Sequence, residues 1–139
     1  MSYKTRCMKK VLLYGGRASS LLPLVTEHGF VEDKRTPDVV VSYGGDGTML
    51  HAERAYPGVP KVMVRDSKIC KKCVNIPVEQ VFARLAKNEY TVNTVMKLGV
   101  THRGLHDWAL NDVILAHETP VSAVRYTVAI NGIPYLGGA

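Results

Sequence analysis

Residues 39–48 read Val-Val-Val-Ser-Tyr-Gly-Gly-Asp-Gly-Thr, and this stretch decides the fold. The unbroken β-branched run Val39–Val41 is typical of a parallel strand that is covered on both faces. A glycine turn ends the run, and from Thr48 to about Tyr56 apolar residues recur at helical spacing. The stretch therefore predicts a strand, a glycine turn and a helix.

Strands and helices also alternate on either side of this unit. The further expected elements are a strand at residues 11–14, a helix that Ser19 or Ser20 caps and Gly29 stops, a strand at 61–64 and a helix at 78–85. Alternation of this kind indicates an α/β layer with a parallel, Rossmann-like sheet.

The composition of the chain changes after about Glu89. The expected β segments are residues 90–96, 108–115 and 121–130, with a polar turn at 101–107 and a hairpin turn at Asn131-Gly132 that Pro134 weakens on its second strand. We therefore predict an α/β nucleotide-binding domain at 1–89 and, at 90–139, the first strands of a β-rich sandwich domain. Because about 45 residues are few for such a domain, we expect a shortened chain or a half that needs a partner. A homo-oligomer would bury its strand edges.

The overall composition restricts the possible partners. The chain has 139 residues, 46% apolar and 22% charged, enough for one domain or for one domain and part of a second. Its net charge of +6 favours anionic partners. Basic residues occur in short clusters with few aromatic residues nearby, so no specific nucleic-acid binding is expected. No apolar stretch approaches the roughly 20 residues of a membrane span, and we predict a cytoplasmic protein.

The turn at residues 43–48 has the composition of a phosphate-binding loop. Gly44, Gly45 and Gly47 allow backbone N–H groups to approach a phosphate closely. The loop lacks the Lys-Ser/Thr ending of a Walker A motif and the Gly-x-Gly-x-x-Gly spacing of a dinucleotide fold. In their place stands Asp46.

A carboxylate among phosphate-binding amides repels the ligand unless it has a chemical role. Asp46 can hold Mg²⁺ on the phosphates, or it can accept a proton from the hydroxyl that attacks the γ-phosphoryl group. Both are roles found in kinases. The alternative is that Asp46 only caps the following helix and that the glycines form a tight turn.

These residues carry a resemblance. The segment Gly44–Thr48, followed by Met49-Leu50 and Ala52, resembles the signature of the NAD kinase family, within the wider group that includes diacylglycerol, sphingosine and 6-phosphofructokinases. The segment Ala109–Val113 resembles the Asn-Glu/Asp motif of that family. The resemblance covers nearly all of this chain and the N-terminal half of a family member.

The resemblance implies ATP-dependent, Mg²⁺-assisted phosphorylation of the 2′-hydroxyl of the adenosine ribose of NAD. Asp46 would be the general base. The residues that would bind nucleotide are Gly44, Gly45, Gly47, Thr48, Asn111 and Asp112, the last two by hydrogen bonds to NAD. Weak or no activity is expected of this segment by itself, and the phosphoryl donor stays open between ATP and polyphosphate.

One segment departs from the family pattern. Residues 64–73 stand where the family has an Asn-x-Gly-x-x-Gly-Phe-Leu type segment. A lipid or other small-molecule kinase with the same loop is therefore one alternative. Another is a non-catalytic nucleotide-binding or redox-responsive module that uses Cys70-x-x-Cys73. A zinc site at this pair would need further ligands, for which His51, His102, His106 and His117 are candidates.

Overall fold

The computed structural model describes residues 7–66, 73–116, 118–119 and 121–135. The chain divides into two compact units, Met1–Thr94 and Val95–Ala139. None of the helices in the described part of the chain combines the length and apolar character needed to cross a membrane.

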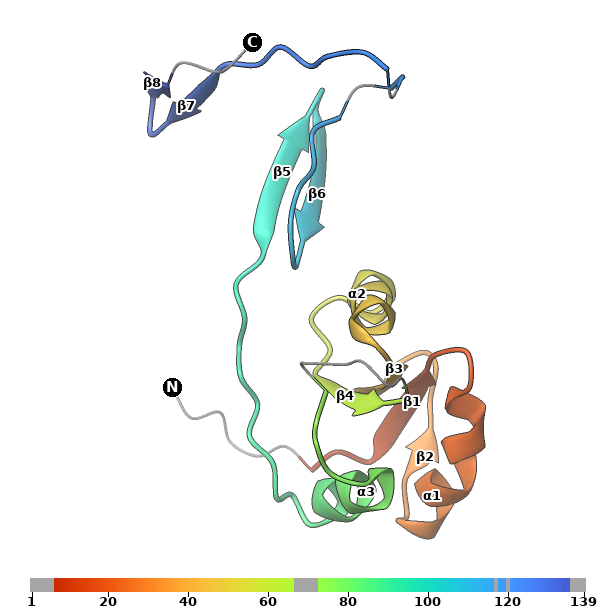
Figure 1. The fold of residues 1–139 in the computed structure, drawn as a ribbon. Coiled ribbons are helices and arrows are strands. Elements are labelled where there is room, and N and C mark those ends of the chain that lie inside the picture. Colours follow the sequence, from red (N-terminus) through yellow and green to blue (C-terminus); the bar gives the residue numbers. More distant parts are fainter. Residues whose placement is uncertain (1–6, 67–72, 117, 120, 136–139) are drawn as a thin grey trace. The chain divides into compact units, whose positions relative to one another are not determined.

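The first unit is an α/β layer around a parallel sheet (Figure 1). Its elements are β1 (Lys10–Tyr14), the 3-10 helix η1 (Ala18–Leu21), α1 (Leu22–Glu27), β2 (Val31–Glu32), β3 (Val39–Gly44), α2 (Asp46–Ala55), β4 (Lys61–Arg65) and α3 (Val78–Ala86). The strand order is β2-β1-β3-β4, and all three pairings are parallel. The predicted fold class is confirmed.

Strand β3 is buried on both faces, as its β-branched run predicts. Val39 and Val41 belong to the larger core, where they pack with residues of η1, α1 and α3. Val40 points to the opposite face, where it packs with Leu12 and with Ala52 of α2. Successive side chains of a strand alternate between faces. Helix α2 therefore covers one face of the sheet, and α1 and α3 cover the other (Figure 1).

The helix after β1 begins differently from the prediction. Neither Ser19 nor Ser20 caps it, because the chain first forms η1 and then enters α1 with Leu21 at the N-cap position and no capping side chain. The Ser20 hydroxyl donates instead to the carbonyl oxygen of Arg17 at 2.8 Å. The predicted stop is confirmed: Gly29 has a φ of +75°, a conformation that glycine adopts without strain.

A buried ion pair ties α2 to β4. The Lys61 ammonium contacts the Glu53 carboxylate, and it donates to the carbonyl oxygens of Tyr56 at 2.7 Å and Val59 at 2.8 Å. The Glu53 carboxylate also accepts the N–H of Gly58 at 3.1 Å. Only 5% of the Lys61 side chain is exposed, so its three donors are satisfied inside the protein. The network fixes the turn that leads from α2 into β4.

Replacing Lys61 by Ala should lower the free energy of unfolding by about 3 kcal/mol, because a carboxylate and two carbonyl groups lose their buried partner. The measurement is urea denaturation followed by circular dichroism. Lys34→Ala is the matched control, since Lys34 is exposed in the turn after β2, and we expect a change within about 0.5 kcal/mol. Equal losses in the two variants would contradict the assigned role of the ion pair.

The described part of the second unit contains two antiparallel hairpins, β5 (Leu98–His102) with β6 (Leu105–Ala109) and β7 (Val128–Ile130) with β8 (Ile133–Tyr135). The predicted Asn131-Gly132 turn is confirmed, and positive φ angles of 52° and 80° match a type I′ turn. Pro134 is tolerated opposite Ala129 because alternate pairs of an antiparallel ladder exchange no hydrogen bonds.

Other β predictions were wrong in their positions. Residues 90–96 form no strand, and of the segments 108–115 and 121–130 only residues 108–109 and 128–130 are in strands. Within the predicted turn at 101–107, only Arg103 and Gly104 turn the chain, and the rest pairs as β5 and β6. In β5, Gly99 leaves room for the indole of Trp108 directly across the ladder. β-branched residues form a strand only where a neighbouring strand is available to pair.

Candidate functional site

The carboxyl ends of β1, β3 and β4 meet at one edge of the parallel sheet. From this edge β1 leads into η1 and α1 on one face, whereas β3 leads into α2 on the other face. The chain directions thus diverge between β1 and β3, which are adjacent strands. Such a switch point is where open α/β sheets bind ligands.

The glycine-aspartate loop lies at this switch point. β3 ends at Gly44, and the N-cap residue of α2 is Gly45, which has no side chain with which to cap the helix. The first N–H groups of this ten-residue helix point toward its N-terminus, which lies at the carboxyl end of β3. The positive end of the helix dipole lies at the same place. A Cβ at Gly44 would lie 2.9 Å from Cβ of Thr48 and closer still to its hydroxyl. Glycine is thus required for the first turn of α2 to fold back on the strand end.

Asp46 is the first residue of α2 and is exposed. Gly45, and not Asp46, holds the N-cap position of the helix. A carboxylate in the first turn is stabilised by the helix dipole. The predicted residues Gly44, Gly45, Asp46, Gly47 and Thr48 are thus brought together in one strand-to-helix turn, and their nucleotide-binding and catalytic roles stay predictions.

The turn after β1 packs tightly against the end of β3. Gly15 has a φ of +136°, and a Cβ there would lie 3.2 Å from the carbonyl carbon of Tyr43 and well inside contact distance of its oxygen. The same Cβ would lie 3.4 Å from the Thr48 methyl group. The glycine turn of β1 and the glycine-aspartate loop are therefore in direct contact.

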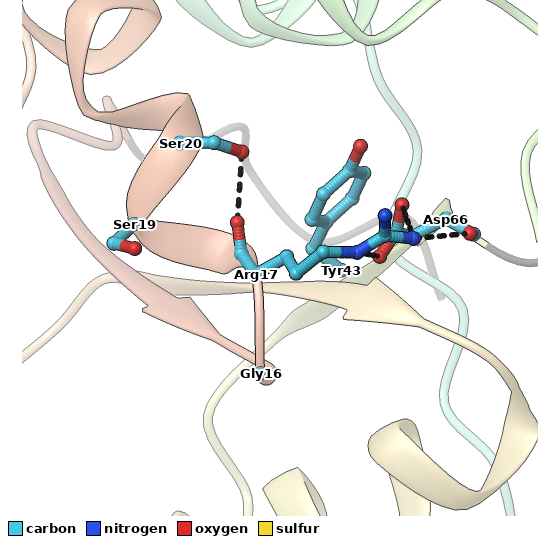
Figure 2. Close-up of a pocket in the computed structure, with 6 residues that line it drawn as sticks. All are labelled: Gly16, Arg17, Ser19, Ser20, Tyr43 and Asp66. Atoms are coloured by element: carbon cyan, nitrogen blue, oxygen red, sulfur yellow. Dashed lines mark hydrogen bonds and ion pairs between the residues drawn. The ribbon is translucent and has the colours of Figure 1, made fainter.

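A cavity of about 390 Å³ opens beside these turns (Figure 2). It is lined by Gly16, Arg17, Ser19, Ser20, Tyr43 and Asp66. The Arg17 guanidinium donates to the Asp66 carboxylate through Nε at 2.8 Å and through Nη2 at 2.7 Å. Burial and then the neighbouring Asp66 carboxylate raise the pKa of the Tyr43 phenol, which stays protonated at neutral pH.

Sequence reasoning did not identify Arg17 and Asp66. The available signal was positional: each residue follows a predicted strand of the sheet, and the carboxyl ends of parallel strands share one edge. Pairing across 49 residues of sequence is not encoded in any local pattern. The order of β1, β3 and β4 in the sheet is what places Asp66 beside Arg17.

The remaining predicted residues lie elsewhere. Asn111 and Asp112 belong to the second unit, directly after β6, where the Asn111 amide donates to the Asp112 carboxylate at 3.0 Å. Their proposed contact with NAD stays a prediction. Cys70 and His117 lie outside the described residues. Within the described ranges, no three His, Cys, Asp or Glu side chains group closely enough to hold a metal ion.

The fold and the strand-end loop define an α/β protein with a glycine-aspartate turn at its switch point. Over 39 residues, or 28% of this chain, the sequence is 44% identical to the proteins named NAD kinase 1 of Bacillus thuringiensis subsp. konkukian and of Bacillus anthracis. The matched segment spans 15% of the length of each relative. No family model matches the chain. The likeness to these kinases is therefore a likeness of one short segment.

Proposed function

We propose that this chain is part of an NAD kinase-like phosphotransferase that phosphorylates the 2′-hydroxyl of the adenosine ribose of NAD. The observation that carries the proposal is the exposed Asp46 carboxylate in the first turn of α2, where a glycine turn begins the helix at the switch point. The partial similarity to NAD kinase 1 supports this choice of acceptor.

The residues of the loop suit a transfer from a nucleoside triphosphate. The amides of Gly47 and Thr48, in the first turn of α2, and the helix dipole would bind phosphate oxygens. Asp46 would accept the proton of the ribose hydroxyl while the hydroxyl oxygen forms a bond to the γ-phosphorus. The bond between that phosphorus and the β,γ-bridging oxygen would break at the same time and release ADP. Bound Mg²⁺ would neutralise charge on the phosphates. Mg²⁺ is commonly held by one carboxylate together with substrate oxygens and water, and Asp46 can supply such a ligand.

The test is a coupled assay for NADP formation from NAD, ATP and Mg²⁺, with this chain and with a longer polypeptide that contains it. We expect NADP to form in the longer polypeptide and little or none with the 139-residue chain. Phosphorylation of a diacylglycerol or another small alcohol in place of NAD would favour the alternative kinase. Nucleotide binding without any turnover in either polypeptide would contradict a kinase altogether.

A redox-responsive nucleotide-binding module is the second candidate. One observation favours it: Sγ of Cys73 lies 3.6 Å from the carbonyl oxygen of Gly44, so the end of the Cys-x-x-Cys segment touches the glycine-aspartate loop. Cys73 is in a disulfide in the structure, and in such a module reduction of that disulfide would shift the loop and its affinity for nucleotide. It is distinguished from the kinase by the absence of turnover and by binding that changes on reduction.

A further inference from the structure

The cavity beside Arg17 lies on the face of the sheet opposite to α2. Tyr43 lines the cavity and packs against the larger core, which α1 and α3 cover. Helix α2 packs on the other face through Ala52. The end of β3 therefore separates the cavity from the first turn of α2, and both open at the same sheet edge.

The Arg17 guanidinium is held in one orientation by Asp66. Nε and Nη2 donate to the two carboxylate oxygens, and Nη2 also donates to the carbonyl oxygen of Asp66 at 3.2 Å. These bonds use three of the five N–H donors of the side chain. Among the described residues, the two donors of Nη1 have no partner, and Figure 2 shows one guanidinium nitrogen without a dashed line.

The ion pair spans the end of the central strand. Arg17 follows β1 and Asp66 follows β4, while β3 lies between these two strands. Asp66 is further held by its N–H, which donates to the carbonyl oxygen of Gly44 at 3.4 Å. The oriented guanidinium is thus fixed to the strand that carries the glycine-aspartate loop. An anion bound at Nη1 would lie at the same sheet edge as that loop, across the end of β3.

The lining favours an anion with several acceptor oxygens. Both Asp66 oxygens already accept from Arg17, so they attract a cation weakly. The Ser20 hydroxyl already donates a hydrogen bond to the Arg17 carbonyl oxygen. The unused edge of the Arg17 guanidinium offers two donors, which match the oxygens of a phosphate group.

We propose that the cavity binds a phosphate group of the phosphoryl donor, with Arg17 Nη1 as the hydrogen-bond donor. Asp66 is the positioning residue that holds the guanidinium, because 73% of the Arg17 side chain is exposed and would otherwise be mobile. The inference rests on the proposed phosphotransferase function for the identity of the ligand. The ligand chemistry, a chain of linked phosphates, is shared by ATP and inorganic polyphosphate.

The experiment is isothermal titration of the 139-residue chain with two probes, ATP and inorganic tripolyphosphate, at one fixed salt concentration. Arg17→Ala should weaken binding of both probes by roughly tenfold or more, as expected for the loss of a charge-assisted contact. Arg35→Ala is the matched control. It removes the same charge from an exposed turn beside the amino-terminal ends of β1 and β3, and it should leave both affinities unchanged. Circular dichroism verifies that each variant is folded.

Arg17→Lys tests the orientation of the guanidinium. Lysine keeps the positive charge but lacks the planar guanidinium. It therefore cannot bind Asp66 along one edge and present a second edge of N–H groups to a ligand. Binding of both probes should therefore be weaker than in the wild type and stronger than in Arg17→Ala. Wild-type affinity in Arg17→Lys would overturn the role given to Asp66.

The outcomes separate this inference from the proposed function. The inference is overturned when the wild type binds neither probe, or when Arg17→Ala and Arg35→Ala have equal effects. Phosphate binding that depends on Arg17, in a protein that transfers no phosphoryl group to NAD, would support the phosphate site and contradict the NAD kinase. If both probes depend on Arg17, tighter wild-type binding of ATP assigns the nucleotide as the donor, and tighter binding of tripolyphosphate assigns a polyphosphate.

Discussion

Asp46→Asn is expected to lower the rate of NADP formation by about 10²–10⁴-fold in a polypeptide that is active, the range associated with general acid–base catalysis. Asparagine has nearly the same shape as aspartate, but it cannot accept the proton of the attacking hydroxyl. Asp46 is exposed in the first turn of α2, so the substitution changes no buried contact of the core. The measurement is kcat and KM for NAD and ATP.

The effect on binding separates the possible roles of Asp46. As a general base, Asp46 contributes to the transition state, so kcat should fall while KM for ATP changes little or decreases, because a negative charge leaves the phosphate loop. As a Mg²⁺ ligand, its loss should raise the Mg²⁺ concentration needed for half-maximal rate. The matched control is Glu27→Gln, which neutralises an exposed carboxylate at the end of α1 and should leave both parameters unchanged. An unchanged rate in Asp46→Asn would remove the basis of the enzymatic proposal.

The parallel sheet was predictable from sequence because its signals are local. The run Val39–Val41 is both β-branched and bounded by glycine, and the structure buries all three side chains. The order of strands and helices then predicts the fold class without any knowledge of distant contacts. The same holds for the Asn131-Gly132 hairpin, where two residues determine the turn.

The elements that escaped prediction depend on partners far away in the sequence. Val95 and Met96 have the composition of a strand, yet they are 62% and 88% exposed and pair with no neighbouring strand in the described part of the chain. The two-residue strand β2 is too short to carry a pattern of its own, and it exists because Lys10 and Val11 of β1 offer a free edge. The Arg17–Asp66 pair follows the same rule, because strand order places two loop residues across the end of β3.

Gly15→Ala is expected to destabilise the first unit by about 2–6 kcal/mol, the sum of backbone strain and overpacking. At a φ of +136° an alanine is strained whatever the surrounding space, and the atom nearest to its Cβ is the carbonyl oxygen of Tyr43 in β3. That oxygen belongs to the backbone of a central strand, so it cannot move aside like the end of a flexible side chain. The β1 turn or the end of β3 must shift, and urea denaturation measures the cost.

The neighbouring glycine provides the control for this prediction. A Cβ at Gly16 would meet no atom within 4 Å, so Gly16→Ala should change the free energy of unfolding by less than about 1 kcal/mol. Equal stability of the two variants would show that the turn accommodates a side chain and that its contact with Tyr43 is not a constraint. A Cβ at position 15 would also meet the Thr48 methyl group, and the position lies two residues before Arg17. A shift of this turn therefore alters both the glycine-aspartate loop and the oriented guanidinium. Any Gly15→Ala protein that still folds should therefore bind tripolyphosphate more weakly than Gly16→Ala.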